Sequence, residues 1–166
     1  MSTEDNKAIV QRYWEELWNT GNLASIEEIF APDYVVRIAE RTKRNVSLWR
    51  TAFPDLHFTI EDILAEGDKV VVRWTVRGTN RGNIEIESGE TLPPTGKHVS
   101  FAGMDLYHCR GGKIAELRRS WDIAPARSSA GLGGGGKIVE LKRSGDVRGL
   151  TMTDLLQDLG VVPTAG

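Results

Sequence analysis

The sequence predicts an α+β fold in which helices pack on one face of a curved antiparallel sheet. Up to residue 53, apolar residues recur every three or four positions, as in amphipathic helices. From residue 57 they alternate with polar residues, as in strands that form a meander. A chain of 166 residues is long enough for one domain with its own core, so we expect residues 1–166 to form a single domain.

Three helices and a short strand are expected in the first third of the chain. The first helix spans residues 3–20 and buries an aromatic stripe. A second begins after Asn22 and ends at Pro32, which we interpret as a helix breaker. The short apolar run 34–38 predicts a strand, and residues 45–53 predict the third helix.

Four longer strands should make the sheet. Their expected positions are residues 57–65, 69–77, 99–109 and 113–121, with glycine-containing turns between the first two and between the last two. The long connection 78–97 contains Gly, Asn and Pro, so we expect a hairpin arm there. A short closing helix is expected at residues 153–159.

Alternation sorts the side chains of these strands into two faces. In the second strand one face is apolar, and Arg73 lies on the other. In the third strand Asp105 shares a face with Phe101, while Met104 lies on the opposite face. Both faces of this third strand are apolar, so the pattern leaves open which of them lines the interior.

A duplication near the C-terminus accounts for the high glycine content. GGKIAELRRSWD (111–122) recurs 24 residues later as GGKIVELKRSGD (135–146), with 9 of 12 positions identical. Residues 123–146 hold six of the 18 glycines; their Gly run lacks the GK[ST] ending of a phosphate loop. We expect the first copy to form the last strand of the sheet. The alternative is that the second copy takes this place.

Composition and charge exclude several classes of protein. A net charge of −2 provides no basic face for nucleic acid. No apolar run approaches the roughly 18 residues of a membrane span, and the N-terminus lacks signal-peptide character. Cys109 is the single cysteine, and the His and acidic residues show no metal-ligand spacing. We therefore expect a cytoplasmic protein without nucleic-acid, membrane or metal binding.

Most of the chain resembles the SnoaL-like polyketide cyclase family, within the nuclear-transport-factor-2-like superfold. The resemblance rests on the helical start and on three later stretches, at residues 6–35, 53–82, 92–122 and 155–163. It implies a cone-shaped, strongly bent antiparallel sheet wrapped by helices around a deep apolar pocket. It also implies a homodimer formed through the sheet, and no cofactor.

The resemblance transfers only part of the cyclase chemistry to this chain. In cyclases of the family an aspartate on the last strand acts as general acid and base, a role that suits a carboxyl group in an apolar pocket. Aligned from the turn before that strand, this position falls on Arg119, and an arginine cannot act as a base. Asp122, three residues further on, is the nearest substitute.

Two other enzyme types of the superfold are matched in part. Asp105 falls where ketosteroid isomerases keep a protonated aspartic acid, but the base position of those enzymes lies near Ile38. Arg73 matches the arginine of limonene-epoxide-hydrolase-like enzymes, whose two flanking aspartates fall on Thr75 and Arg119. No known constellation is therefore complete.

The resemblance implies a cofactor-independent cyclase or isomerase acting on an apolar, carbonyl-bearing small molecule. Asp105 or Asp122 would exchange the proton, and Arg73 would stabilise the enolate. Two alternatives stay open, namely a non-catalytic small-molecule binding protein of the same fold and an epoxide hydrolase. The expected pocket residues, mostly aromatic, are Trp14, Trp18, Tyr34, Trp49, Phe53, Trp74, Phe101, Met104, Arg119 and Trp121.

Overall fold

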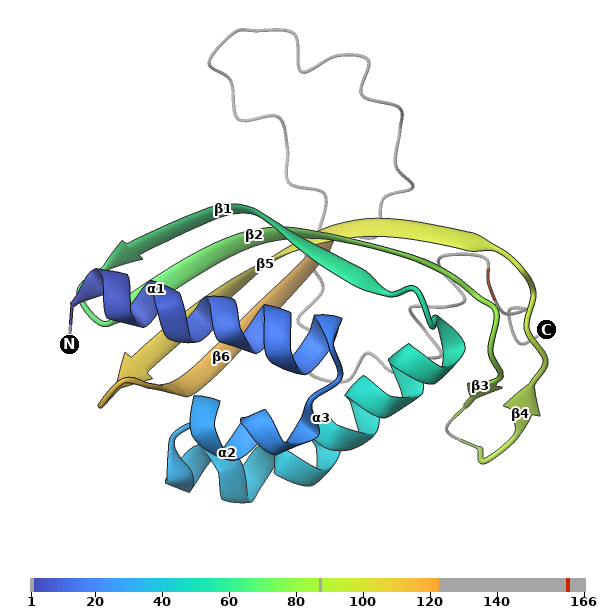
Figure 1. Ribbon diagram of the computed structural model, residues 1–166, viewed down its shortest axis with the longest axis horizontal. Helices are drawn as coiled ribbons and strands as arrows, with labels where there is room; N and C mark the ends of the chain where they lie inside the picture. Colours follow the sequence, from blue (N-terminus) through green and yellow to red (C-terminus); the bar gives the residue numbers. More distant parts are fainter. Residues whose placement is uncertain (1, 87, 123–160, 162–166) are drawn as a thin grey trace, which may run out of the picture.

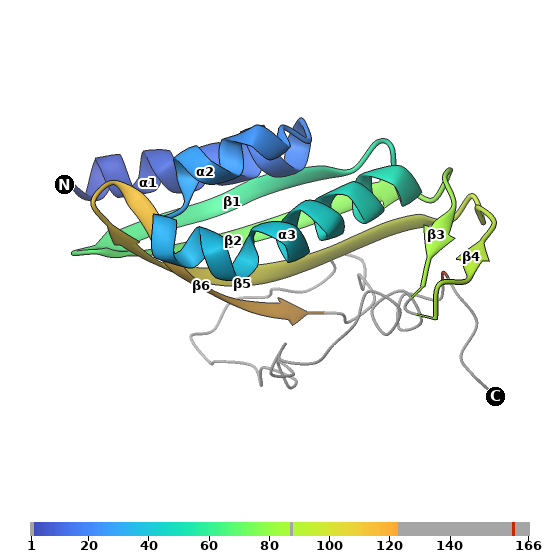
Figure 2. The ribbon, with the colours of Figure 1, turned by 90° about the horizontal axis from the view of Figure 1, so that it is seen from below.

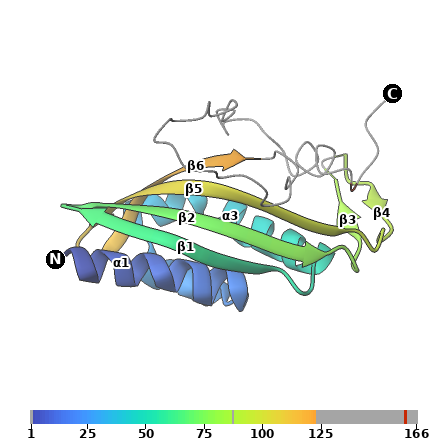
Figure 3. The same cartoon turned by 90° about the horizontal axis from the view of Figure 1, so that it is seen from above.

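The computed structural model describes residues 2–86, 88–122 and 161 and confirms the predicted α+β fold. A four-stranded antiparallel sheet, in the order β1-β2-β5-β6, curves around a layer of helices (Figures 1 and 2). Seen from the opposite side, the outer face of this sheet lies in front of α3 (Figure 3). The strands are β1 (His57–Glu66), β2 (Lys69–Thr79), β5 (His98–Arg110) and β6 (Lys113–Asp122).

The N-terminal helical segment has two parts and is followed by two short helices. The α-helix α1 (Thr3–Arg12) continues into a wider π-helix, η1 (Tyr13–Asn19), and Gly21 ends the segment with a φ of 73°. The short helices η2 (Leu23–Ser25) and α2 (Ile26–Ile29) follow. The wider π-helical turn carries the aromatic stripe, and its buried residues are Tyr13, Trp14, Leu17 and Trp18.

The prediction of a strand at residues 34–38 is wrong, and the third helix is longer than expected. A single helix, α3, runs from Pro32 to Ala52. Pro32 occupies the first turn, where its missing N–H is tolerated, so it begins this helix rather than breaking the chain. The apolar residues of 34–38 misled the prediction because Val36 points to solvent and is 86% exposed, whereas Val35 and Ile38 pack on the core.

The strands have the predicted positions, extended by one or two residues at several ends. Two register irregularities, at Ile60/Asp62 and at His108/Cys109, increase the local twist of the sheet. The predicted arm begins two residues later than expected, because β2 extends to Thr79, and comprises residues 80–97. Its short strands β3 (Ile84–Glu85) and β4 (Thr91–Leu92) lie beside the C-terminal end of α3 (Figure 1).

The structure settles which face of β5 lines the interior. Asp105 lies on the inner face and is 1% exposed, whereas Met104 on the outer face is 48% exposed. On β2 the apolar face is buried as predicted, and Arg73 lies on the outer face. The core therefore occupies the space between the inner face of the sheet and the helices.

The first copy of the duplication forms β6, as expected, and pairs with β5. The second copy (135–146) and the predicted closing helix (153–159) lie outside the described residues. No helix in the described part of the chain is both long and apolar enough to span a membrane.

Candidate functional site at the Asp105–Arg119 pair

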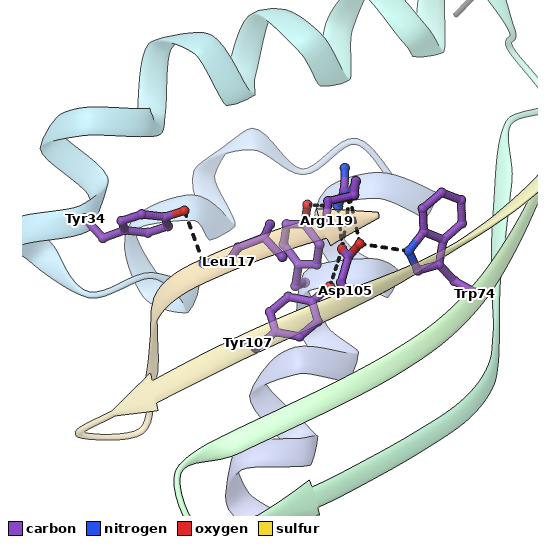
Figure 4. A network of polar contacts seen from close by, with 7 residues as sticks. Tyr34, Trp74, Asp105, Tyr107, Leu117 and Arg119 are labelled. Atoms are coloured by element: carbon purple, nitrogen blue, oxygen red, sulfur yellow. Dashed lines mark hydrogen bonds and ion pairs between the residues drawn. The ribbon is translucent and has the colours of Figure 1, made fainter. Parts of the chain in front are cut away.

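A buried ion pair lies between the last two strands of the sheet. Asp105 on β5 and Arg119 on β6 are register partners, so their side chains emerge side by side on the inner face. Nε of Arg119 lies 2.9 Å from Oδ1 of Asp105, and Nη2 lies 2.7 Å from Oδ2 (Figure 4). The side chains are 0% and 17% exposed for Asp105 and Arg119, respectively, so the pair is largely removed from water.

Two neutral donors complete the surroundings of the carboxylate. Nε1 of Trp74 donates to Oδ1 of Asp105 at 3.0 Å, and the Tyr107 hydroxyl donates to Oδ2 at 2.9 Å (Figure 4). Tyr107 reaches it because residues two apart on a strand share a face. The register partner of Trp74 is Gly103, two residues before Asp105 on β5, so Trp74 and Asp105 lie near each other on the inner face.

Arg119 is surrounded by aromatic rings. Its guanidinium carbon lies 5.3 Å from the ring centre of Trp14, 6.0 Å from Trp18 and 5.7 Å from Trp74. Nη2 also donates to the Tyr13 hydroxyl at 2.9 Å. Among the described residues, nothing accepts a hydrogen bond from Nη1 of Arg119.

The electrostatics of the cluster favour a charged arginine. Burial, the largest single influence, would lower the pKa of Arg119, but Asp105 together with Tyr13 and Tyr107 outweighs it and raises that pKa well above its ordinary value. Burial, together with the nearby carboxylate, raises the pKa of Tyr107 well above its usual range. Burial likewise raises the pKa of Tyr13. The site therefore consists of a permanent cation, its counter-ion and two neutral phenols at ordinary pH.

A small cavity adjoins Arg119. Its volume is about 20 Å³, enough for about one water molecule. Five of its wall residues are among those predicted, namely Trp18, Trp49, Trp74, Phe101 and Arg119. The sequence analysis missed Leu56, Phe58 and Val76. The period-two pattern already places Val76 on the same face as Trp74, and that signal was sufficient to include it.

Four of the other expected wall residues do not line the cavity or have no described side chain. Trp14 and Phe53 are fully buried in the core without lining the cavity. Tyr34 lies on α3, and its hydroxyl accepts a hydrogen bond from the backbone N–H of Leu117 at 3.3 Å (Figure 4). For Trp121 only the backbone is described; it pairs with Gly103.

The structure does not bring Arg73 or Met104 to the inner site. Strand alternation places both on the outer face, where Nε of Arg73 forms an exposed ion pair with Asp62 at 2.7 Å. Asp122 is the last residue of β6; its backbone pairs with Ala102, and its side chain is not described. Of the three expected catalytic residues, Asp105 is the one that the structure places on the inner face, and its partner there is Arg119.

The described part of the chain offers neither a metal site nor a reactive thiolate. No group of three or more His, Cys, Asp and Glu side chains is arranged there to hold a metal ion. Burial raises the pKa of the Cys109 thiol to about 11, so it is not a thiolate at neutral pH.

Comparison with known proteins identifies the family of this chain. The sequence profile of the SnoaL-like polyketide cyclase family matches residues 8–128, more than half of the chain. The chain belongs to this family. A search of curated proteins finds no match.

Solved structures share the SnoaL-like fold. A protein from Acidithiobacillus ferrooxidans described as a polyketide cyclase is 28% identical, with a TM-score of 0.58 over 74% of this chain and 92% of the other. IdmH from Streptomyces antibioticus, also described as a polyketide cyclase, is 26% identical, with a TM-score of 0.55 over 70% and 91%. AclR from Streptomyces galilaeus, described as a hydroxylase, is 23% identical and shows the fold alone, with a TM-score of 0.60 over 99% and 87%.

This SnoaL-like protein has an arginine where the sequence resemblance places the cyclase aspartate. The structure shows what accompanies it, because Asp105 on the neighbouring strand holds the guanidinium in place. Register was the information that the sequence analysis lacked, since it treated Asp105 and Arg119 as separate candidates.

Proposed function

We propose that this protein is a cofactor-independent cyclase or isomerase that moves a proton next to a carbonyl group of an apolar small molecule. Membership of the SnoaL-like family supports the reaction class. The observation that carries the proposal is a buried guanidinium bordering an aromatic cavity, with Nη1 lacking an acceptor among the described residues. A charged donor in water-poor surroundings stabilises the negative oxygen of an enolate.

A second donor at the cavity supports a ligand that carries an oxygen atom. Trp18 lines the cavity, and its indole N–H is buried without a hydrogen bond of normal geometry, although it lies near the Tyr13 hydroxyl. A buried donor without an acceptor costs about 1–3 kcal/mol. A carbonyl oxygen placed between Trp18 and Arg119 would recover this energy, whereas a pure hydrocarbon would not.

The contacts favour a positioning role for Asp105 rather than proton transfer. Its two oxygens already accept hydrogen bonds from Arg119, Trp74 and Tyr107. A carboxylate so occupied has no free lone pair directed at a ligand. In this proposal Asp105 orients Arg119, Arg119 stabilises the enolate, and the proton exchanges with solvent water. Asp122 is not the base, because its pairing with Ala102 places it on the outer face of the sheet with Met104.

The cavity constrains how a ligand enters. A volume of about 20 Å³ is too small for any carbocyclic ligand, so the aromatic side chains must move apart when one binds. The substrate class that fits the walls is a mainly apolar ring compound with one carbonyl directed at Arg119. Binding should therefore change the fluorescence of the tryptophans that line the cavity.

Proton exchange next to a ketone tests the proposal without knowledge of the natural substrate. The probe is 1-tetralone in D2O, with loss of its α-hydrogen signal followed by NMR. The wild-type protein should accelerate this loss, and Arg119→Met should lower the rate at least 100-fold, as expected for loss of the donor that stabilises the enolate. The matched control is Arg73→Met on the outer face, which should leave the rate unchanged.

The second candidate function is non-catalytic binding of the same class of molecule. The occupied lone pairs of Asp105 favour it, because they leave the inner face without a described base. Tryptophan quenching by 1-tetralone with no acceleration of exchange would establish this alternative. An epoxide hydrolase receives no such support, since Arg73 and Thr75 face outward and pair with Asp62 and Glu61.

A further inference from the structure

An open groove lies on the surface between the segment that follows η1 and the C-terminal half of α3. Its volume is about 300 Å³, at the lower end of the range of roughly 300–1,000 Å³ that is typical of small-molecule pockets. It shares no wall residue with the cavity at Arg119, so it is separate from the site described above.

Arg50 is the one charged residue among the described residues that line this groove. Nη1 of Arg50 donates hydrogen bonds to the carbonyl oxygens of Trp18 at 2.9 Å and Asn19 at 2.8 Å. Nε and Nη2 donate to no described residue, and no described carboxylate pairs with the guanidinium. Because an arginine is protonated at any ordinary pH, the groove contains a cation that lacks a counter-ion among the described residues.

Gly21 leaves the unused edge of this guanidinium uncovered. A Cβ atom at residue 21 would lie 2.8 Å from Nε and 3.1 Å from Cδ of Arg50, so a side chain there would crowd this edge. The N–H groups of Nε and Nη2 form the fork that matches two oxygens of a carboxylate or a phosphate. Since Nη1 is already bonded to two carbonyl groups, the fork is held in place, and a ligand loses little affinity by ordering it.

The other walls of the groove suit the organic part of such an anion. Ser47 and Thr51 lie four residues apart on α3, so their exposed hydroxyl groups face the groove one helical turn from each other. Leu23 and the buried Val46 supply apolar surface. The groove therefore offers a fixed cation, two hydroxyl groups and an apolar floor.

The charges around the groove favour an anion over a cation. Lys43 lies four residues before Ser47 on the same face of α3 and adds positive charge beside the groove. Its contact with the carboxylate of Glu40 is long, at 3.8 Å, and the Glu40 side chain is 95% exposed. The carbonyl groups at the end of η1 are partly negative, but those of Trp18 and Asn19 already accept hydrogen bonds from Arg50.

We propose that this groove binds a small organic anion, whose carboxylate or phosphate group lies on Nε and Nη2 of Arg50. The apolar part of the anion packs on Leu23 and Val46. This inference does not rest on the function proposed for the inner site, because the two sites share no wall residue. A neutral molecule of the same shape lacks the oxygens that pair with the fork and should bind at least about tenfold more weakly.

Titrations with benzoate and with phenyl phosphate, followed by ¹H–¹⁵N NMR of the full chain, test this inference. Both probes carry a compact apolar ring, so the one with the lower Kd identifies the preferred anionic group. The amide signals of Gly21, Ser47 and Thr51 should shift saturably with at least one of them. Benzamide is the neutral control. Ionic strength is held constant, because salt screens an exposed charge.

A substitution that repels anions locates the site. Ser47→Glu places a carboxylate in the groove and should weaken binding of the anion at least about tenfold, while its exposed position preserves the fold. The matched control is Asn45→Glu, the same change of charge at an exposed position of α3 that does not line the groove. It should keep the Kd within about twofold of wild type. Arg50→Gln should abolish the saturable shifts; if it fails to fold, Ser47→Glu decides.

The proposal is overturned if neither anion shifts the signals of Gly21, Ser47 and Thr51, or if benzamide binds as tightly as the anions. Equal binding by Ser47→Glu and Asn45→Glu also overturns it. Saturable shifts confined to amides of β5 and β6 would place the anion at Arg119 instead, and they contradict a site in the groove whether or not the inner site is catalytic.

Discussion

The Asp105–Arg119 pair places two charges where water hardly reaches. Transfer of such a pair from water costs several kcal/mol, which its Coulombic attraction and added hydrogen bonds offset only when the geometry is good. Here two hydrogen bonds join the pair side by side, and Trp74, Tyr107 and Tyr13 satisfy further polar atoms. Such a cluster is better explained by a function that needs a fixed cation than by its contribution to stability.

A double-mutant cycle at this pair should show strong coupling. Arg119→Met leaves a buried carboxylate without its cation and should lower the free energy of unfolding by about 3–5 kcal/mol. In Asp105→Asn/Arg119→Met the loss should be smaller than the sum of the two single losses by at least about 1.5 kcal/mol. Urea unfolding followed by tryptophan fluorescence measures these values.

The outer face offers a matched control for this cycle. Arg73→Met removes an arginine from an exposed ion pair with Asp62, so it should cost less than about 1 kcal/mol. Equal losses for Arg73→Met and Arg119→Met would contradict the distinction between the two arginines.

At the residue scale the sequence predicts the members of the site but not their partnership. Alternation along β5 and β6 identifies Asp105 and Arg119 as strand residues in apolar surroundings. Their pairing depends on the register between the two strands, which a single sequence does not specify. Arg73 was misassigned for the same reason. Alternation along β2 places it on the face opposite the apolar one, but without the register its distance from Asp105 could not be predicted.

Asn80 connects the arm 80–97 to the end of α3. It is fully buried, and its Nδ2 donates to the carbonyl oxygens of Ala52 and Gly82 at 3.0 Å. Its Oδ1 accepts from the backbone N–H of Thr95 at 2.8 Å. One side chain therefore joins both ends of the arm to the helix.

Asn80→Ala should loosen this arm. It leaves the carbonyl oxygen of Gly82 and the backbone N–H of Thr95 without the partners they have in the wild-type protein, so the free energy of unfolding should fall by about 2–4 kcal/mol. Amide exchange within β3 and β4 should also accelerate. The control is Asn45→Ala on the exposed side of α3, expected within about 0.5 kcal/mol of wild type. An unchanged exchange rate in the arm would contradict the anchoring role.

Asp55 fastens the end of β2 in a pH-dependent way. Its carboxylate accepts the backbone N–H of Thr79 at 2.6 Å, and this bond lowers the pKa of Asp55. Because the pKa is lower in the folded state, the stabilisation is present above the ordinary pKa of about 4 and is lost as the pH falls through the folded-state value.

Asp55→Asn should therefore lower the stability only at pH values above the folded-state pKa of Asp55. The side chain is exposed, so we expect a loss below about 1 kcal/mol at pH 7 and no difference from wild type at pH 2. Thermal unfolding at both pH values measures it. A difference that grows toward low pH would contradict the assigned sign.

At the element scale the strands were predictable and the helix α3 was not. The period-two pattern of β2 and β5 matches their burial because both strands have one face on the core. Residues 34–38 are rich in β-branched side chains, yet the helix that begins at Pro32 includes them. Packing of Val35 and Ile38 against the core, one helical turn apart, outweighs their local preference.

The outer face of the sheet carries an exposed apolar row. Leu64, Val71 and Leu106 are register neighbours across β1, β2 and β5, and Met104 lies close by. Leu64 is 68% exposed and Leu106 39%. Figure 3 shows this face of the sheet in front of α3. We propose that a second copy of the chain covers it.

Light scattering should give the mass of a dimer for the wild-type protein and of a monomer for Leu106→Glu. The circular dichroism spectrum should be unchanged, since the residue lies outside the core. Val36→Glu, on the exposed side of α3, is the control and should remain dimeric. A monomeric wild-type protein, or a Leu106→Glu variant that remains dimeric, would contradict this assignment.

At the scale of the whole molecule the sequence predicted the aromatic interior but not how fully it is packed. The rings of Trp14, Phe58 and Trp74 contact one another in the core between the sheet and the helices. Side-chain volume near each residue decides the size of a cavity, and a sequence pattern does not contain this information. A ligand can therefore reach Arg119 only when these rings move apart.

The most direct measurement is the infrared carbonyl stretch of 1-tetralone bound to the protein at saturating protein concentration. A hydrogen bond from a guanidinium weakens the carbonyl bond, so the stretch should lie at a lower wavenumber than in an alkane solvent. Arg73→Met should show the same shift as the wild-type protein. A bound ketone whose carbonyl stretch equals that in alkane would contradict the central claim that Arg119 polarises the ligand.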